Sequence, residues 1–201
     1  MKKFFALAAA AAALAGVAFA DPAVDAAAPA FSGPAANGET ISLDQFKGQT
    51  VILEWTNDGC PFVQKHYETG NMQNTQKSAN DAGAVWITVM SSAPGKQGHA
   101  DATRANKLMK EWAAAPDYIL LDPDGVVGKA YGAKTTPQMA LIDKDGVLRY
   151  AGAIDDKPSA NHATVNGATN YLLAALASVE KGEPVAVKET KPYGCSVKYK
   201  S

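Results

Sequence analysis

The stretch that decides the fold is Trp55-Thr56-Asn57-Asp58-Gly59-Cys60-Pro61-Phe62-Val63. The apolar run before it, residues 51–53, predicts a buried strand, and the mixed polar and apolar segment after it predicts a helix. Cys60 therefore falls at a strand-to-helix turn. Pro61 takes the first helical position, where its missing N–H would have no partner in any case.

Cys60 is the first candidate for a functional side chain. The free N–H groups and the dipole at a helix start favour a negative charge, so a thiol there ionises more easily than a free cysteine. Asp58 opposes this effect, because a nearby negative charge raises the pKa of a thiol. We expect a reactive, partly accessible sulfur; the alternative is a buried structural cysteine.

The N-terminus has the pattern of an export signal. Lys2 and Lys3 precede an apolar run over residues 4–17, and Ala18-Phe19-Ala20 fits a small-x-small cleavage site. A retained membrane anchor is the alternative, but the run is too short for an ordinary span. We therefore expect residues 1–20 to be removed as a signal peptide, which leaves a periplasmic or secreted protein with no stable membrane span.

The mature chain has the composition of one ordinary domain. Loss of Lys2 and Lys3 leaves 17 basic against 20 acidic side chains, which suggests neither nucleic acid nor a polybasic membrane patch. Residues 21–34 are rich in Ala and Pro with few large apolar side chains, so we predict a flexible leader there. Residues 35–201 are long enough for a domain with its own core.

Strands and helices alternate along the chain and end in a pair of strands. The turn signal Asn37-Gly38 also predicts a hairpin of two short strands. This order predicts a three-layer α/β fold with a mixed sheet. The expected strands are residues 50–55, 84–90, 118–122, 139–143 and 147–152, and the expected helices are residues 62–79 with a break near Gly70, 100–112, 126–131 and 166–180.

Cys60-Pro61-Phe62-Val63 after a strand, with Thr136-Pro137 far downstream, resembles the thioredoxin fold. In that fold a cis-proline loop faces the reactive cysteine, and Pro137 is the matching residue. The resemblance implies a three-layer α/β/α sandwich around a central mixed β-sheet. It also implies a substrate site at Pro61, Phe62, Thr136 and Pro137, where the backbone of Thr136 binds an extended substrate.

Within that fold, residues 33–55 resemble the redoxin branch, which includes alkyl hydroperoxide reductase and thiol-specific antioxidant proteins. The whole chain from about residue 31 is similar to a peroxiredoxin-like subgroup of thioredoxin-fold proteins. The further motifs that fit are Tyr131-Gly132-Ala133, Ala153-Ile154-Asp155-Asp156 and Gly194-Cys195-Ser196-Val197-Lys198.

Val63 stands where a thioredoxin has its second cysteine, so Cys60 has no local disulfide partner. Cys195 is the other cysteine of the chain, and export permits a disulfide. Pro192 and Gly194 provide a stiff bend and a permissive joint that can turn the tail back over the fold. We predict that Cys195 comes within disulfide reach of Cys60 and resolves it; a permanent structural bridge is the alternative.

The peroxiredoxin pattern is incomplete. Asn57 and Leu53 stand where a typical peroxiredoxin has Thr or Ser and Pro before its reactive cysteine. Such enzymes also use an arginine at the site, and neither Arg104 nor Arg149 can be placed there from sequence. These departures weaken the case for efficient peroxidase chemistry.

Glu54 interrupts an otherwise apolar strand, six positions before Cys60. Thioredoxin carries a buried aspartate at the same offset, which handles a proton during exchange. Burial raises the pKa of a carboxyl group and suits it to proton transfer near neutral pH. The alternative is a glutamate paired with a lysine at a strand edge.

The histidines do not suggest a metal site. His66, His99 and His162 lack a paired ligand spacing, and Val63 removes the second cysteine that a copper carrier of this fold would need. The Asp-rich turns at residues 122–125 and 143–146 lack a full set of calcium ligands. The sequence therefore predicts no metal and no cofactor.

Three functions fit these residues. The first is an exported thiol-disulfide oxidoreductase that uses Cys60, with Cys195 as resolving partner and Glu54 as proton carrier. The second is a weak thiol peroxidase that uses the same cysteine, and the third is a non-catalytic binding module that presents the surface around Pro137. The expected partners are a protein or small-molecule thiol or disulfide and an external thiol reductant.

Overall fold

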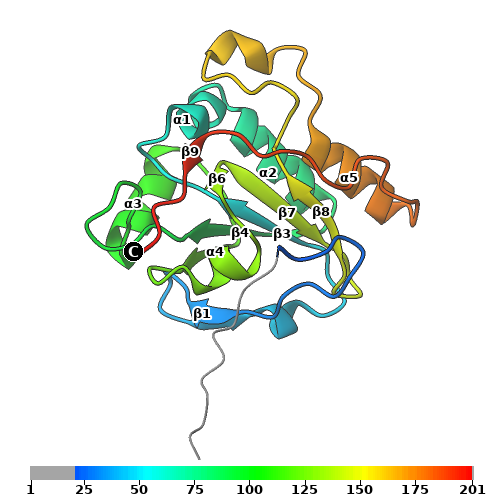
Figure 1. Cartoon of the computed structure of the whole chain (residues 1–201), viewed down its shortest axis with the longest axis horizontal. Helices are drawn as coiled ribbons and strands as arrows, with labels where there is room; N and C mark the ends of the chain where they lie inside the picture. Colours follow the sequence, from blue (N-terminus) through cyan, green and yellow to red (C-terminus); the bar gives the residue numbers. More distant parts are fainter. Residues whose placement is uncertain (1–20, 201) are drawn as a thin grey trace, which may run out of the picture.

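The computed structural model describes residues 21–200 and is built on one five-stranded sheet (Figure 1). The strands lie in the order β5-β4-β3-β7-β8. β3 (Val51–Trp55), β4 (Val85–Met90) and β5 (Tyr118–Leu121) are parallel. β7 (Gln138–Ile142) runs antiparallel to β3, and β8 (Leu148–Gly152) runs antiparallel to β7, so the sheet is mixed, as predicted.

Helices cover one face of the sheet. α1 (Pro61–Glu68), α2 (Asn71–Asp81) and α5 (Tyr171–Glu180) share a core with side chains of that face, and α3 (Ala102–Glu111) packs beside them on β4 and β5. α4 (Val126–Ala130) lies on the opposite face with the N-terminal segment. This arrangement confirms the predicted three-layer α/β/α fold of the thioredoxin type.

β3 is buried on both faces over its whole length. Its alternating side chains send Ile52 and Glu54 toward α1 and send Leu53 and Trp55 toward α4. Packing on both faces of the sheet fixes the position of this central strand. The carboxyl end of β3 therefore delivers Cys60 to a fixed place between the layers.

Two glycines set helix boundaries. Gly70, with a φ of 75°, separates α1 from α2 at the predicted break. The last helix begins at Tyr171 rather than near residue 166, because Gly167 has a φ of 75° and the side chain of Asn170 caps the helix. The remaining elements are β1 (Ser32–Pro34) and β2 (Thr40–Ser42), which form the predicted hairpin, the 3-10 helices η1 (Leu43–Phe46) and η2 (His162–Val165), and the short strands β6 (Thr135–Thr136) and β9 (Cys195–Ser196).

Residues 21–34 are part of the fold, and the prediction of a flexible leader is wrong. Phe31 is buried in the core below the sheet. The N–H of Asp25 donates to the carbonyl of Leu148 at 2.8 Å, and the N–H of Leu148 donates to the carbonyl of Ala26 at 2.9 Å. Backbone pairing holds a segment that has few large apolar side chains. The predicted signal peptide, residues 1–20, lies outside the described residues.

The tail after α5 wraps around the edge of the sheet and passes over Cys60 (red in Figure 1). The N–H of Thr190 donates to the carbonyl of Ala151 on β8 at 3.2 Å. Further on, β9 pairs with β6, and the N–H of Ala93 donates to the carbonyl of Lys198 at 2.8 Å. The tail is therefore held at three successive places.

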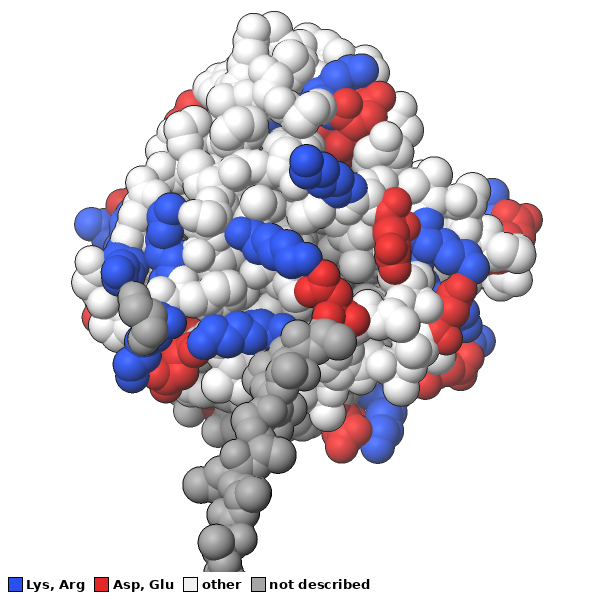
Figure 2. Space-filling model, in the orientation of Figure 1, with Lys and Arg blue, Asp and Glu red and all other residues white. Residues whose placement is uncertain are grey.

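Two observations concern the surface and the membrane. Between residues 21 and 200, none of the helices combines the length and the apolar character that a membrane crossing requires. On the face shown in Figure 2, positive and negative side chains are interspersed rather than gathered in one patch of a single sign.

Replacing Phe31 by alanine tests the docking of the N-terminal segment. We expect the free energy of unfolding to fall by about 3 kcal/mol, because the substitution leaves a cavity in the core. Urea denaturation of the chain from residue 21 measures the change. Val126→Ala is the control, since Val126 is 61% exposed and its truncation should change stability by less than about 0.5 kcal/mol. Equal effects of the two substitutions would contradict the docked segment.

Candidate active site

Cys60 lies immediately before α1, with extended backbone angles, and Pro61 is the first helical residue, as predicted. The residue is completely buried, so the expectation of a partly accessible sulfur is wrong. The physical reason is the tail, which covers the helix start at Cys195.

The Thr136–Pro137 peptide bond is cis, as predicted, and its loop faces Cys60. The Cys60 thiol donates to the carbonyl oxygen of Thr136 at 3.1 Å. Phe62, the next residue of α1 after Pro61, is partly buried in the same cluster as Cys60. The structure thus brings Cys60, Pro61, Phe62, Thr136 and Pro137 to one site.

Cys195 also contacts the Cys60 sulfur. Its backbone N–H donates to Cys60 Sγ at 3.4 Å, and Cys195 is the register partner of Thr136 in the β6–β9 ladder. Both cysteines are free thiols. Gly194 permits this approach, because its φ is 124° and a Cβ there would lie 1.9 Å from the carbonyl oxygen of Thr136.

The two thiols differ in acidity. Burial would raise the pKa of the Cys60 thiol, but hydrogen bonds from the side chain and backbone N–H of Cys195 help to outweigh it and hold the pKa below its ordinary value. Burial and the hydrogen bond to Cys60 raise the pKa of Cys195 to about 11. Cys60 is therefore the more acidic thiol of the pair, and the Cys195 thiol donates to it once it ionises.

Asp58 was expected to oppose the thiolate, and Arg104 offsets its charge. The guanidinium Nη2 of Arg104 lies 2.7 Å from a carboxylate oxygen of Asp58, and Nη1 lies 2.9 Å from Glu111. Arg104 thus reaches the loop before Cys60 but is already bound to two carboxylates. Arg149 lies elsewhere, in ion pairs with Asp25 and with Asp143.

Glu54 is fully buried on the central strand. Its carboxylate accepts hydrogen bonds from Tyr67 at 2.8 and 3.0 Å, from Trp86 at 3.0 Å and from Thr88 at 3.2 Å. Burial raises the pKa of this carboxyl group, although the hydrogen bonds act in the opposite sense. The alternative of a lysine pair at a strand edge is wrong. Neither cysteine is among its hydrogen-bond partners within residues 21–200, so proton transfer by Glu54 stays a prediction.

A buried polar cluster beside the site was missed from the sequence. Lys65, His66 and Asp155 are all at most 2% exposed, and the hydroxyl of Tyr193 meets all three. The sequence indicated only that His66 lacks the paired spacing of a metal ligand. Asp155 and Tyr193 lie in segments already noted from the sequence, the stretch at residues 153–156 and the tail. Nothing in the sequence indicates that these two segments meet.

A family model described as Redoxin matches residues 23–172. The chain belongs to the Redoxin family. The match includes Cys60, Thr136 and Pro137, whereas Cys195 lies beyond the matched residues. In this redoxin the second sulfur of the site is therefore supplied by the tail.

Solved structures of the same fold extend the comparison. A hypothetical protein from Sinorhizobium meliloti is 24% identical with a TM-score of 0.76. The alignment covers 90% of this chain and 97% of that protein. An uncharacterized conserved protein from Geobacillus kaustophilus is 25% identical with a TM-score of 0.75, covering 89% and 93%. The thioredoxin domain of a thiol-disulfide oxidoreductase from Bacteroides vulgatus is 23% identical with a TM-score of 0.52, covering 72% and 96%. A comparison with curated proteins returns no match.

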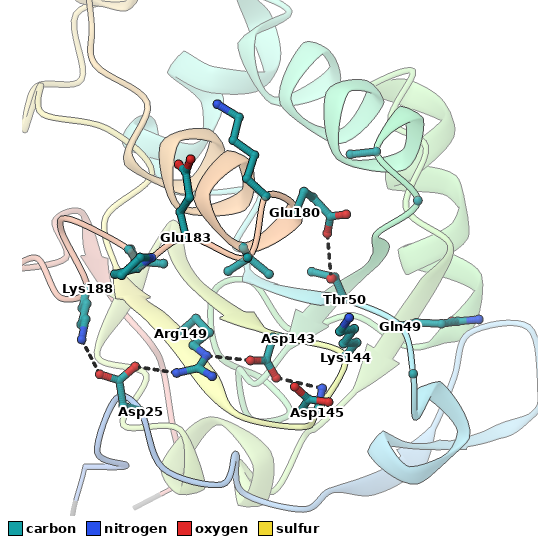
Figure 3. Close-up of a pocket in the computed structure, with 18 residues that line it drawn as sticks. Asp25, Gln49, Thr50, Asp143, Lys144, Asp145, Arg149, Glu180, Glu183 and Lys188 are labelled. Carbon is teal, nitrogen blue, oxygen red and sulfur yellow. Dashed lines mark hydrogen bonds and ion pairs between the residues drawn. The ribbon is translucent and has the colours of Figure 1, made fainter.

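A polar depression of about 820 Å³ lies at the other end of β3 from Cys60 (Figure 3). Its lining includes Thr50, just before β3, and Asp143, just after β7. Arg149 bridges Asp143 and Asp25, at 2.6 and 3.0 Å, so these charged groups satisfy one another. Among residues 21–200 there is no group of three or more His, Cys, Asp or Glu arranged to hold a metal ion.

Substitution of Cys195 by alanine tests the source of the Cys60 acidity. We expect the pKa of Cys60 to rise, because the variant loses the donating thiol. A pH titration of the ultraviolet thiolate absorbance measures the shift. Ser196→Ala is the control at the neighbouring position of β9 and should leave the pKa of Cys60 unchanged. An unaltered pKa in Cys195→Ala would show that the Cys195 thiol does not lower the pKa of Cys60.

His66 generates a prediction for stability against pH. Burial and the nearby Lys65 charge lower the pKa of His66 from 6.5 to about 3. The unfolded chain therefore binds the proton first, so stability that is present above pH 6.5 is lost as the pH falls toward 3. The expected slope is up to about 1.4 kcal/mol per pH unit.

Urea unfolding at a series of pH values measures this slope. His66→Gln should flatten it below pH 6.5, since glutamine binds no proton in this range. His162→Gln, at a half-exposed position, should retain the wild-type slope. A His66→Gln variant with an unchanged slope would rule out a neutral buried imidazole.

Proposed function

We propose that this redoxin is an exported thiol-disulfide oxidoreductase in which Cys60 attacks and Cys195 resolves. The observation that carries the proposal is the position of Cys195 on the Cys60 sulfur, with opposite pKa shifts for the two thiols. A nucleophile and a resolving thiol need this division of roles, because the thiolate is the attacking species.

The exchange would run in two steps. The Cys60 thiolate attacks one sulfur of a substrate disulfide; a mixed disulfide forms, and the other substrate sulfur leaves and takes a proton from solvent. Cys195 then releases its proton to solvent and attacks the Cys60 sulfur, which frees the first substrate sulfur as a protonated thiol. The substrate disulfide is reduced, and Cys60 and Cys195 hold the new disulfide until an external thiol reductant reduces it.

The substrate would bind at the edge of β6. A strand edge offers unpaired N–H and C=O groups to an extended peptide, and Thr136 carries those groups beside Cys60. Pro61, Phe62 and Pro137 would line the same place. β9 occupies this edge, so an extended substrate can bind only after the tail moves away.

Export is supported by the signal pattern of residues 1–20. The periplasm or the exterior would permit a disulfide between Cys60 and Cys195 to persist between turnovers. A peroxiredoxin-like activity has less support, because Arg104 is bound to Asp58 and Glu111 rather than free to meet a peroxide.

Trapping a mixed disulfide tests the proposed roles. With excess oxidised glutathione, Cys195→Ala should accumulate a glutathione adduct on Cys60, because no thiol resolves it. The wild type should instead lose two hydrogens as an intramolecular disulfide, and Cys60→Ala should form little adduct. Mass spectrometry of the intact protein separates the three results.

Other results would select the alternatives. Two free thiols in oxidised wild type would defeat the resolving role of Cys195. A bridge that survives mild reductant would make Cys195 a structural staple. Rapid hydroperoxide consumption would favour the peroxidase, and full biological activity of Cys60→Ser would favour a non-catalytic binding module.

A further inference from the structure

The hydroxyl of Tyr193 enters a site made by three buried side chains. It donates to a carboxylate oxygen of Asp155, and its oxygen lies 3.1 Å from His66 Nε2 and 3.4 Å from Lys65 Nζ. Lys65 and His66 have no exposed area, and Asp155 is 2% exposed. The Tyr193 hydroxyl therefore occupies a buried polar pocket and is not a surface contact.

The neighbours fix the direction of each hydrogen bond. The side-chain amide of Asn71 donates to His66 Nδ1 at 2.7 Å, so Nδ1 accepts and Nε2 carries the proton of the neutral ring. His66 Nε2–H therefore donates to Tyr193, and Tyr193 donates to Asp155. His66 and Asp155 each form a hydrogen bond with the Tyr193 hydroxyl, and water cannot replace that hydroxyl while the tail is docked.

Tyr193 stands two residues before Cys195 in the docked tail, with only Gly194 between them. Its ring packs on Phe62, with centroids 5.8 Å apart, and Lys65 Nζ lies 5.2 Å from its centroid. Gly194 fits against the carbonyl of Thr136 only because it has no side chain. Because a single residue separates Tyr193 from Cys195, holding the Tyr193 hydroxyl restricts where Cys195 can lie.

We propose that Tyr193 is a positioning residue whose hydroxyl, held by Lys65, His66 and Asp155, keeps Cys195 on Cys60 and keeps the tail closed over the site. This inference rests on the proposed exchange between the two cysteines. It adds that α1 positions both the reactive sulfur and the anchor of the tail. Cys60 immediately precedes the helix, and Lys65 and His66, which bind the Tyr193 hydroxyl, belong to it.

The contact has different consequences in the two redox states. In the disulfide state, the covalent bond holds the tail in place whether or not Tyr193 is anchored. In the dithiol state, only non-covalent contacts hold it, so loss of the hydroxyl lets the tail leave and lets water reach His66 and Asp155. Removing the hydroxyl should therefore favour the dithiol state.

The test is the redox equilibrium of Tyr193→Phe with glutathione. We expect the equilibrium constant for forming the Cys60–Cys195 disulfide to fall roughly tenfold, equivalent to about 30 mV for this two-electron couple. Free thiols are counted by mass after acid quenching and alkylation over a series of glutathione ratios. Tyr131→Phe is the matched control, because its buried hydroxyl donates to Pro29 at 2.7 Å outside the tail. It should leave the constant unchanged.

The result separates two failures. If the wild type forms no intramolecular disulfide at any ratio, the proposed function fails. If the wild type forms it and Tyr193→Phe has the same constant, the exchange stands and the positioning role of Tyr193 is overturned.

A second measurement does not depend on disulfide formation. In a Cys195→Ala background, adding Tyr193→Phe should speed alkylation of Cys60 by roughly tenfold, because the tail uncovers the sulfur more often. Adding Tyr131→Phe to the same background should not. Equal alkylation rates in all three proteins would contradict the closed tail, and circular dichroism confirms that each variant is folded.

Discussion

The pairing of Cys195 with Thr136 is the constraint on which the rest of the site depends. β6 presents an unpaired edge next to a cis-proline loop, and such an edge attracts any extended segment that can complete its hydrogen bonds. In this protein the chain supplies that segment itself. The same pairing buries Cys60, places a donor on its sulfur and blocks the edge that a substrate would use. In the proposed exchange, resolution of a mixed disulfide and entry of a substrate would therefore compete for one strand edge.

α1 connects this edge to the interior of the domain. Lys65 and His66 on the helix hold the hydroxyl of Tyr193, while the next residue, Tyr67, donates to the buried Glu54. One turn of helix thus joins the tail to the central strand through two polar networks. Because buried polar groups are costly to leave unpaired, both networks resist small rotations of α1. The result is a fixed position for Cys60 at the start of the helix.

The sequence was sufficient for the features that depend on neighbours in the chain. The strand-to-helix turn at Cys60 follows from local patterns, and the cis bond before Pro137 follows from a family resemblance. Features made by distant segments were missed or wrong. Burial of Cys60 depends on a tail residue 135 positions away, and His66 finds Tyr193 across 127 positions. Residues 21–34 have few large apolar side chains, yet backbone pairing with Leu148 docks them, which composition does not reveal.

The closed site implies a compromise between two rates. In the proposed exchange, a tightly held tail would bring Cys195 to the mixed disulfide quickly, because the attacking thiol would already lie beside its target. The same tail must lift before an external disulfide can reach Cys60, since the sulfur has no exposed surface. Stronger anchoring would therefore speed the second step and slow the first. A hydrogen-bonded hydroxyl is a suitable anchor for such a tail, because a few polar contacts hold it firmly yet can be replaced by water when it opens.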